Sequence, residues 1–276
     1  MRYSRIGTAV ALLALAGPAA AQVDLSGTVG VSSASVFRGV TDTNRPVLEV
    51  DAAAESTWMG LDLVAGGWLA AEPKAYRGPD ELSLLGEDAR AGVTQGSLWL
   101  DGTRTVGLVS ATLGVTGYLY PAAADLAATY NTVELYGSLW LDVPLSPSVT
   151  LYHDIGKIDG AYLEGAVERA LLSFTDAELV LGAAAGWSLG QATGEGQSAP
   201  ELGYFAANGL THTELLARAS RDVGALSLAT SAHLIFARDE YARVVAPDRE
   251  RTAKFWLGLS IGWSSAARRA SDAERS

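Results

Sequence analysis

The feature that most constrains the fold is a long alternation of apolar and polar residues in the segment TVELYGSLWLDV. One face would hold Val133, Leu135, Gly137, Leu139, Leu141 and Val143, and the other Glu134, Tyr136, Ser138, Trp140 and Asp142. Successive side chains of a strand point to opposite faces, so this period of two predicts a β-strand. Strands of soluble proteins usually have about 5–6 residues, whereas a membrane-spanning strand has about 9–11. The length of this alternation therefore favours a strand that crosses a bilayer.

The segment KFWLGLSIGW near the C-terminus alternates in the same way and carries an aromatic residue at each end of its apolar face. Phe255 and Trp263 lie eight positions apart, which corresponds to roughly 26 Å along a strand at about 3.3 Å per residue. A tilt of about 40° reduces this to roughly 20 Å of membrane depth, close to the distance between the two aromatic girdles of a membrane barrel. We expect Phe255 and Trp263 to lie at the two membrane interfaces.

The same pattern, followed along the chain, predicts about twelve strands. They fall near residues 23–35, 46–57, 59–70, 94–101, 105–118, 131–143, 148–157, 161–174, 177–188, 210–222, 225–238 and 253–264. Tight links, at TWMG, DGT, PLSPS, FTD and DVGA, alternate with longer connections. Outer-membrane barrels combine short periplasmic turns with longer extracellular loops in this way.

The predicted fold class is therefore all-β: a single transmembrane antiparallel barrel of about twelve strands. Closure pairs every strand edge, which lipid cannot do by hydrogen bonding. It also gives a stable fold to a chain without cysteine. A secreted, soluble β-sandwich is the alternative, and it predicts extraction without detergent.

The N-terminal residues MRYSRIGTAVALLALAGPAAAQ have the features of a secretory signal peptide. Arg2 and Arg5 precede an apolar stretch and three alanines, so we expect cleavage after Ala21. The predicted division is a signal peptide at 1–21, the barrel at 22–264 and a polar tail at 265–276. Of the 20 Lys and Arg, Arg2 and Arg5 leave with the signal, so 18 oppose 31 Asp and Glu, a net charge of −13. Such a charge argues against nucleic acid as a partner.

The opening of the mature chain, VSSASVFRGVTDTNRPVLEVDAAAESTWMGLDLVAGGW, carries a set of motif residues. They are Phe37, Arg38, Gly39, Val40, Pro46, Gly60, Gly67 and Trp68. With this spacing the segment resembles the opening of the TorF-type porins, also catalogued as the conserved hypothetical family Gcw_chp. The resemblance implies a porin in the outer membrane of a Gram-negative cell. Its surroundings would be outer-membrane lipid and lipopolysaccharide, and the barrel assembly machinery would insert it.

Acidic residues dominate the faces that we expect to point inward. They are Glu49, Asp51, Glu55, Glu134, Asp142, Glu164, Glu168, Glu178 and Glu214, with Arg218 as the inward basic residue. Carboxylates along a pore favour cations. These positions predict a porin-like channel for passive diffusion of small polar solutes, with a mild preference for cations. A lumen in which the same acids only solvate packed side chains is the alternative.

The Phe37-Arg38-Gly39 element precedes Pro46, and we expect it to form the outer turn between the first two strands. Arg38 in this turn has two interpretations. In the structural interpretation, Gly39 permits the turn and Phe37 sits at the membrane interface. In the functional interpretation, Arg38 bends into the mouth of the barrel, pairs with carboxylates and narrows it.

No catalytic, cofactor-binding or metal-binding motif is recognisable. His153 with Ser146 or Ser148 would be the starting point for a membrane-embedded hydrolase, but no G-x-S-x-G element surrounds them. The acidic segment GPDELSLLGEDAR is best explained as a solvated loop. Several tryptophans fall near strand ends and suit either interface anchoring or sugar stacking. A non-conducting barrel that binds or adheres through its extracellular loops is the second functional interpretation.

Overall fold

The computed structural model describes residues 23–73, 92–121, 131–158, 160–174, 176–192, 204–239, 244–246, 249–250 and 252–265. The predicted signal peptide (1–21), the acidic loop (78–90) and all but the first residue of the predicted tail (265–276) lie outside these residues. Within the part that is described, no helix is long and apolar enough to cross a membrane.

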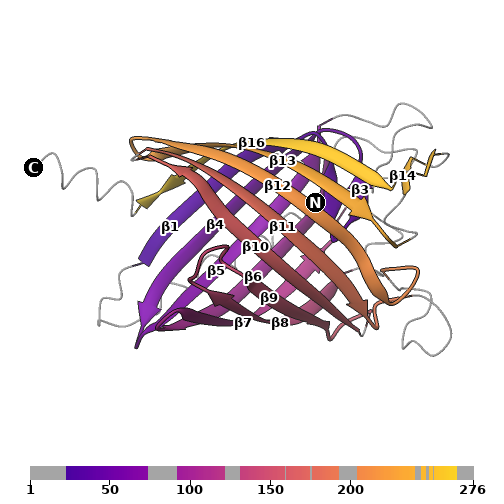
Figure 1. Cartoon of the computed structure of the whole chain (residues 1–276), viewed down its shortest axis with the longest axis horizontal. Coiled ribbons are helices and arrows are strands. Elements are labelled where there is room, and N and C mark those ends of the chain that lie inside the picture. The colour runs from indigo at the N-terminus through magenta and orange to yellow at the C-terminus, as the bar shows by residue number, and fades with distance from the viewer. Residues whose placement is uncertain are drawn as a thin grey trace, which may run out of the picture.

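Twelve antiparallel strands close into one barrel, which confirms the predicted fold class. They are β1 (Val23–Ser32), β4 (Val47–Trp58), β5 (Leu61–Glu72), β6 (Gly92–Val106), β7 (Val109–Leu119), β8 (Thr132–Leu141), β9 (Ser148–Asp154), β10 (Ala161–Ser173), β11 (Ala177–Leu189), β12 (Gly209–Val223), β13 (Leu226–Ala237) and β16 (Ala253–Ser264). Each pairs with its neighbours in this order, and β1 pairs with β16, from Ser26 opposite Ser264 to Ser32 opposite Gly258. The strands run obliquely around the barrel (Figure 1).

The outer face of the barrel is apolar and exposed. Leu98 on β6, Leu139 on β8 and Leu259 on β16 are each more than half exposed, and Leu113 on β7 is 75% exposed. Burial of apolar surface is worth about 25 cal/mol per Å², so an aliphatic belt around a whole barrel is stable only against another apolar phase. The fold therefore presents a lipid-facing surface, as the alternation predicts.

The two ends of the barrel differ in their connections. At the short-turn end, β-strands are joined by residues 59–60, 107–108, 142–147, 174–176 and 224–225. At the long-connection end, they are joined by 33–46, 73–91, 120–131, 155–160, 190–208 and 238–252. Residues 244–246 (β14) and 249–250 (β15) pair as a small separate sheet within the last of these.

Several predicted strand ends differ from the structure, among them the strand predicted over 148–157, which ends at Asp154, and two of the differences affect the lumen. The tight link predicted at DGT (101–103) is part of β6, because Asp101 and Thr103 continue the inward alternation and pair with Val64 and Asp62 of β5. The actual turn is at Gly107-Leu108, where Gly107 has a φ of 60°. The first strand, predicted over 23–35, ends at Ser32.

Residues 35–43 form a separate hairpin in place of the last part of that strand. β2 (Ser35–Phe37) pairs with β3 (Val40–Thr43), and Arg38 and Gly39 make the turn with φ values of 49° and 85°. This inner hairpin folds into the lumen at the long-connection end, where its contacts are with inward side chains of the wall. A Cβ on Gly39 would lie 2.8–2.9 Å from the imidazole ring and Cβ of His212 on β12. The close approach and the left-handed backbone together require glycine at this position.

Candidate functional site

The strand register places nine of the ten predicted pore-lining residues on the lumen face of the wall, seven of them away from its short-turn end. Paired residues of neighbouring strands share a face, so the sides can be followed around the barrel from the inward residues of β1. The seven are Glu49, Asp51, Glu134, Glu164, Glu168, Glu214 and Arg218. Glu55 and Glu178 have the same parity but are exposed at the short-turn end, and Asp142 follows the end of β8 and is exposed.

The strongest polar contact in the lumen joins the inner hairpin to β8. Arg38 donates two hydrogen bonds to Glu134, from Nη1 to Oε1 and from Nη2 to Oε2, each 2.7 Å long. The two side chains are only 6% and 2% exposed. Gln191, after β11, donates a further hydrogen bond of 3.2 Å to Glu134. A bidentate pair with this geometry, away from water, fixes both position and orientation.

Aromatic rings surround the guanidinium of Arg38. Its central carbon lies 4.7 Å from the ring centroid of Phe37 and 4.5 Å from those of Tyr152 on β9 and Tyr162 on β10. Burial by itself would lower the pKa of Arg38, but the Glu134 carboxylate more than offsets this and holds the pKa above its ordinary value. Arg38 is therefore a permanent cation, held by one carboxylate and three π faces.

The positions of Phe37 and Arg38 in the inner hairpin correct the expectation for Phe37 and decide between the two interpretations of Arg38. The interface position expected for Phe37 is wrong, because its ring packs inside against Tyr118 at 5.6 Å and Tyr204 at 5.8 Å between centroids. Arg38 enters the lumen and pairs with a carboxylate, as in the functional interpretation. Pro46 is exposed and directly precedes β4. The element is thus a turn that points into the barrel.

A second set of contacts holds the other side of the inner hairpin. Lys254 of β16 donates a hydrogen bond of 2.6 Å from Nζ to the carbonyl oxygen of Gly39. Tyr204, in the connection between β11 and β12, donates to the carbonyl oxygen of Phe37 at 3.3 Å. Asp42 on β3 accepts a hydrogen bond from Ser35. Burial raises the pKa of Asp42 to about 7, although the Ser35 hydroxyl and the Lys254 charge act in the opposite direction.

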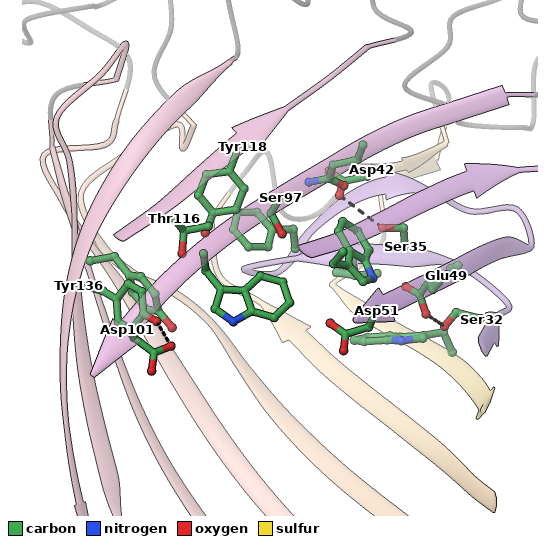
Figure 2. A pocket seen from close by; sticks show the side chains of 18 residues that line it. Ser32, Ser35, Asp42, Glu49, Asp51, Ser97, Asp101, Thr116, Tyr118 and Tyr136 are labelled. Carbon is green, nitrogen blue, oxygen red and sulfur yellow. Dashed lines mark hydrogen bonds between the residues drawn. The ribbon is translucent and has the colours of Figure 1, made fainter. Parts of the chain in front are cut away.

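Beside the hairpin the lumen contains a cavity of about 530 Å³. Its lining combines four carboxylates, Asp42, Glu49, Asp51 and Asp101, with seven aromatic side chains, Phe37, Trp68, Trp99, Tyr118, Tyr136, Tyr152 and Trp256. No Arg or Lys is among the described residues that line it. Figure 2 shows the acids on two sides, with Asp101 beside Tyr136 and Thr116, and with Glu49 and Asp51 across from them. We call this space the acidic chamber.

Only two of the predicted inward acids, Glu49 and Asp51, belong to the acidic chamber. Asp101 was missed because DGT was assigned to a turn, although the alternation continues unbroken through Gly102 to Thr103. Asp42 was missed because the inner hairpin has no counterpart in a simple alternation. The sequence predicts the tryptophans near strand ends only as a group, whereas in the structure Trp68, Trp99 and Trp256 occupy inward positions and Trp99 is the middle residue of β6.

The remaining inward charges lie outside the chamber. Glu214 contacts Nδ1 of His233 at 2.6 Å, and the His233 ring stacks on Trp256 with centroids 4.4 Å apart. Glu168 and Arg218 approach to 3.7 Å with both side chains nearly half exposed. An exposed pair of this kind contributes about 0–1 kcal/mol, so it has little structural effect.

The outward aromatic residues occupy the two ends of β16. Phe255 is 63% and Trp263 49% exposed on the apolar face. His153 also points outward on β9, whereas Ser148 lies on the lumen face of the same strand, opposite Trp140 and Ala166. The strand therefore places His153 and Ser148 on opposite faces, and Ser146 precedes the strand at the end away from His153. Among the described residues, no group of three or more His, Cys, Asp or Glu could hold a metal ion.

Comparison with known proteins gives a likeness of architecture. No family model matches the chain, and no curated protein matches it, so the TorF-type resemblance stays a prediction. The KdgM porin is similar in structure (8% identity, TM-score 0.45, 87% of this chain and 98% of that one). So are the COG4313 outer membrane channel from Pseudomonas putida F1 (12%, 0.49, 88% and 95%) and LpxR from Salmonella typhimurium (10%, 0.47, 86% and 99%). No residue role is transferred at these identities, and the barrel assignment rests on the strand pairing described above.

Proposed function

We propose that the protein is an outer-membrane channel for passive diffusion of small polar solutes. The observation that carries the proposal is a closed barrel with an apolar exterior around a polar interior that contains the acidic chamber. A barrel of this kind is stable in lipid and offers water-soluble molecules an interior path. The Gram-negative outer membrane, with its lipopolysaccharide and its barrel assembly machinery, is the location that this proposal implies.

The proposed path passes the acidic chamber, because the inner hairpin occupies the lumen on the side of Glu134 and Tyr162. The chamber lining carries four carboxylates and no Arg or Lys among the described residues. Of the two basic side chains that hold the inner hairpin, Arg38 is neutralised by its bidentate partner Glu134, and Lys254 donates to the carbonyl oxygen of Gly39. A path of this charge attracts cations and repels anions. Mild cation preference is therefore part of the proposal.

Planar-bilayer recording of the refolded protein tests the channel. Steady current steps in symmetric KCl support passive conduction. A preparation that inserts, shows heat-modifiable gel mobility and never conducts would overturn it.

The second candidate, a non-conducting barrel that acts through its extracellular connections, is favoured by the packing around the inner hairpin. Tyr162 and Phe205 are fully buried and stack with centroids 5.8 Å apart, and His212 and Gln191 are nearly as inaccessible. If the acidic chamber is closed as well as this side of the lumen, no path remains, and the protein should insert without conducting. The bilayer experiment therefore separates the two candidates.

A further inference from the structure

The acidic chamber combines two features that bear on what it binds: carboxylates, and aromatic rings that lie against inward glycines of the wall. The second feature is independent of the first. A Cβ on Gly66 of β5 would overlap the indole of Trp99 and lie 2.6 Å from its Cε2 atom. The Trp99 indole therefore lies over Gly66, against the wall, in space that a side chain on that residue would fill.

Tyr136 on β8 is placed in the same way over an inward glycine of β7, which separates β8 from β6. A Cβ on Gly114 of β7 would lie 2.6 Å from the phenolic oxygen of Tyr136, and the hydroxyl of Tyr136 donates a 2.7 Å hydrogen bond to Asp101. Figure 2 shows this ring and carboxylate side by side at one edge of the chamber. Inward glycines thus leave room for two rings beside the acids of the chamber.

The carboxylates of the chamber are not equivalent. Glu49 accepts a hydrogen bond from Ser32, Asp42 accepts one from Ser35, and Asp101 accepts one from Tyr136. Asp51 has no hydrogen bond or ion pair to another side chain in the described part of the chain. It is the cross-strand neighbour of Trp68, which pairs with Ser97 of β6, and Trp99 follows two residues later on the same face of β6. One carboxylate without a partner therefore lies beside two indoles.

We propose that the acidic chamber is a binding site for small organic cations of the quaternary or alkylated ammonium class, with Asp51 as the counter-ion and Trp99 and Trp68 as π faces. An alkylated ammonium suits this lining better than a metal cation, because its weak hydration is replaced by ring faces rather than by many oxygen ligands. The volume of about 530 Å³ lies within the range of small-molecule sites, about 300–1,000 Å³. The inference rests on the proposed function in that it assigns a solute class to the same lumen.

The test is a titration of intrinsic tryptophan fluorescence with choline chloride, on the full refolded barrel in a polyoxyethylene detergent. This detergent carries neither a choline headgroup nor a sugar, so it does not compete. Sodium chloride controls for ionic strength. An uncharged isostere of choline, with a tert-butyl group in place of the trimethylammonium group, controls for apolar burial, and maltose is the competitor for a sugar-binding site.

We expect saturable binding of choline, with the uncharged isostere weaker by about tenfold or more, since only the cation is attracted by the ring faces and by the Asp51 carboxylate. Asp51→Asn should weaken choline by a similar factor, and Trp99→Leu should weaken it too. The matched control Glu55→Gln removes an acid from the same face of the same strand, outside the chamber, and should leave binding unchanged.

Three results would overturn the inference: equal binding of choline and its isostere, an unaltered choline affinity in Asp51→Asn, or displacement of choline by maltose at comparable concentration. These outcomes do not depend on conduction. A barrel that binds choline but never conducts refutes the channel and keeps the binding site, whereas a barrel that conducts without binding choline refutes only the binding site.

Discussion

Removal of the carboxylate at Glu134 should release the inner hairpin from the wall. Glu134→Gln removes the two charge-assisted hydrogen bonds of 2.7 Å. The guanidinium of Arg38 then stays buried among three aromatic rings with only a neutral amide as its partner. Breaking one side of a buried ion pair costs about 3–5 kcal/mol, and about 1.4 kcal/mol is tenfold in an equilibrium, so the undocked fraction should rise by roughly a hundredfold to a few thousandfold.

Cysteine labelling measures this fraction directly, because the chain has no cysteine of its own. Thr41 on β3 is 7% exposed and its hydroxyl makes no hydrogen bond, so Thr41→Cys reports on docking at little cost. When closing is faster than labelling, the rate of reaction with a bulky maleimide follows the undocked fraction. Ser173→Cys, exposed at the short-turn end of β10, gives the rate for a free thiol.

The double variant Arg38→Met with Glu134→Gln separates charge from packing. It leaves no uncompensated charge, so its labelling rate should lie well below that of Glu134→Gln alone. A rate in Glu134→Gln that stays within about twofold of the parent would refute the reasoning, because differences of this size are below about 0.5 kcal/mol. The hairpin would then be held by its other contacts.

Three further expectations concern the hairpin and the outer face. Gly39→Ala should raise the same labelling rate by about tenfold or more, because an L residue in the left-handed region costs about 1–2 kcal/mol and its Cβ meets His212. Gly60→Ala is the control, since Gly60 also has a positive φ but a Cβ there would meet nothing within 4 Å. The pKa of Asp42 is raised by burial to about 7, so docking of the inner hairpin takes up a proton and weakens as pH rises from about 4 toward 7. Asp42→Asn should remove this pH dependence of docking, measured as the labelling rate of Thr41→Cys relative to that of the exposed thiol. Leu259→Arg on the lipid face should lower the free energy of unfolding in phospholipid vesicles by about 2–4 kcal/mol, and Val106→Arg at the short-turn end by about 0–1, and equal losses would contradict the assigned depths.

The strand pattern could be predicted from sequence because each barrel strand faces two solvents. Lipid outside and polar groups inside impose a period of two on every segment, so Leu139 and Glu134 reveal the sides of β8 without any knowledge of its neighbours. The sequence predicts a turn at DGT (101–103) instead of at Gly107, because Gly102, a glycine on the outer face of β6, has the same local sequence pattern as a turn glycine. A continuous inward alternation, through Asp101 and Thr103, is the signal that separates the two cases.

The inner hairpin could not be predicted, because its position depends on contacts between residues far apart in the chain. Arg38 and Glu134 are 96 positions apart, and Lys254 and Gly39 are 215 apart. Local propensity defines the turn at Arg38-Gly39 but not the direction in which it folds. The chamber depends on this direction, so Asp42 could be recognised as one of its acids only in the folded barrel.

The central claim is that solute passes the acidic chamber, and the reversal potential of the open channel in a steep KCl gradient tests it most directly. The account predicts a cation-selective sign for the native protein and a shift toward zero in the double variant Asp51→Asn with Asp101→Asn. It predicts no shift in Glu55→Gln, which lies outside the chamber. A reversal potential that is the same in the native protein and in the double variant would contradict the account.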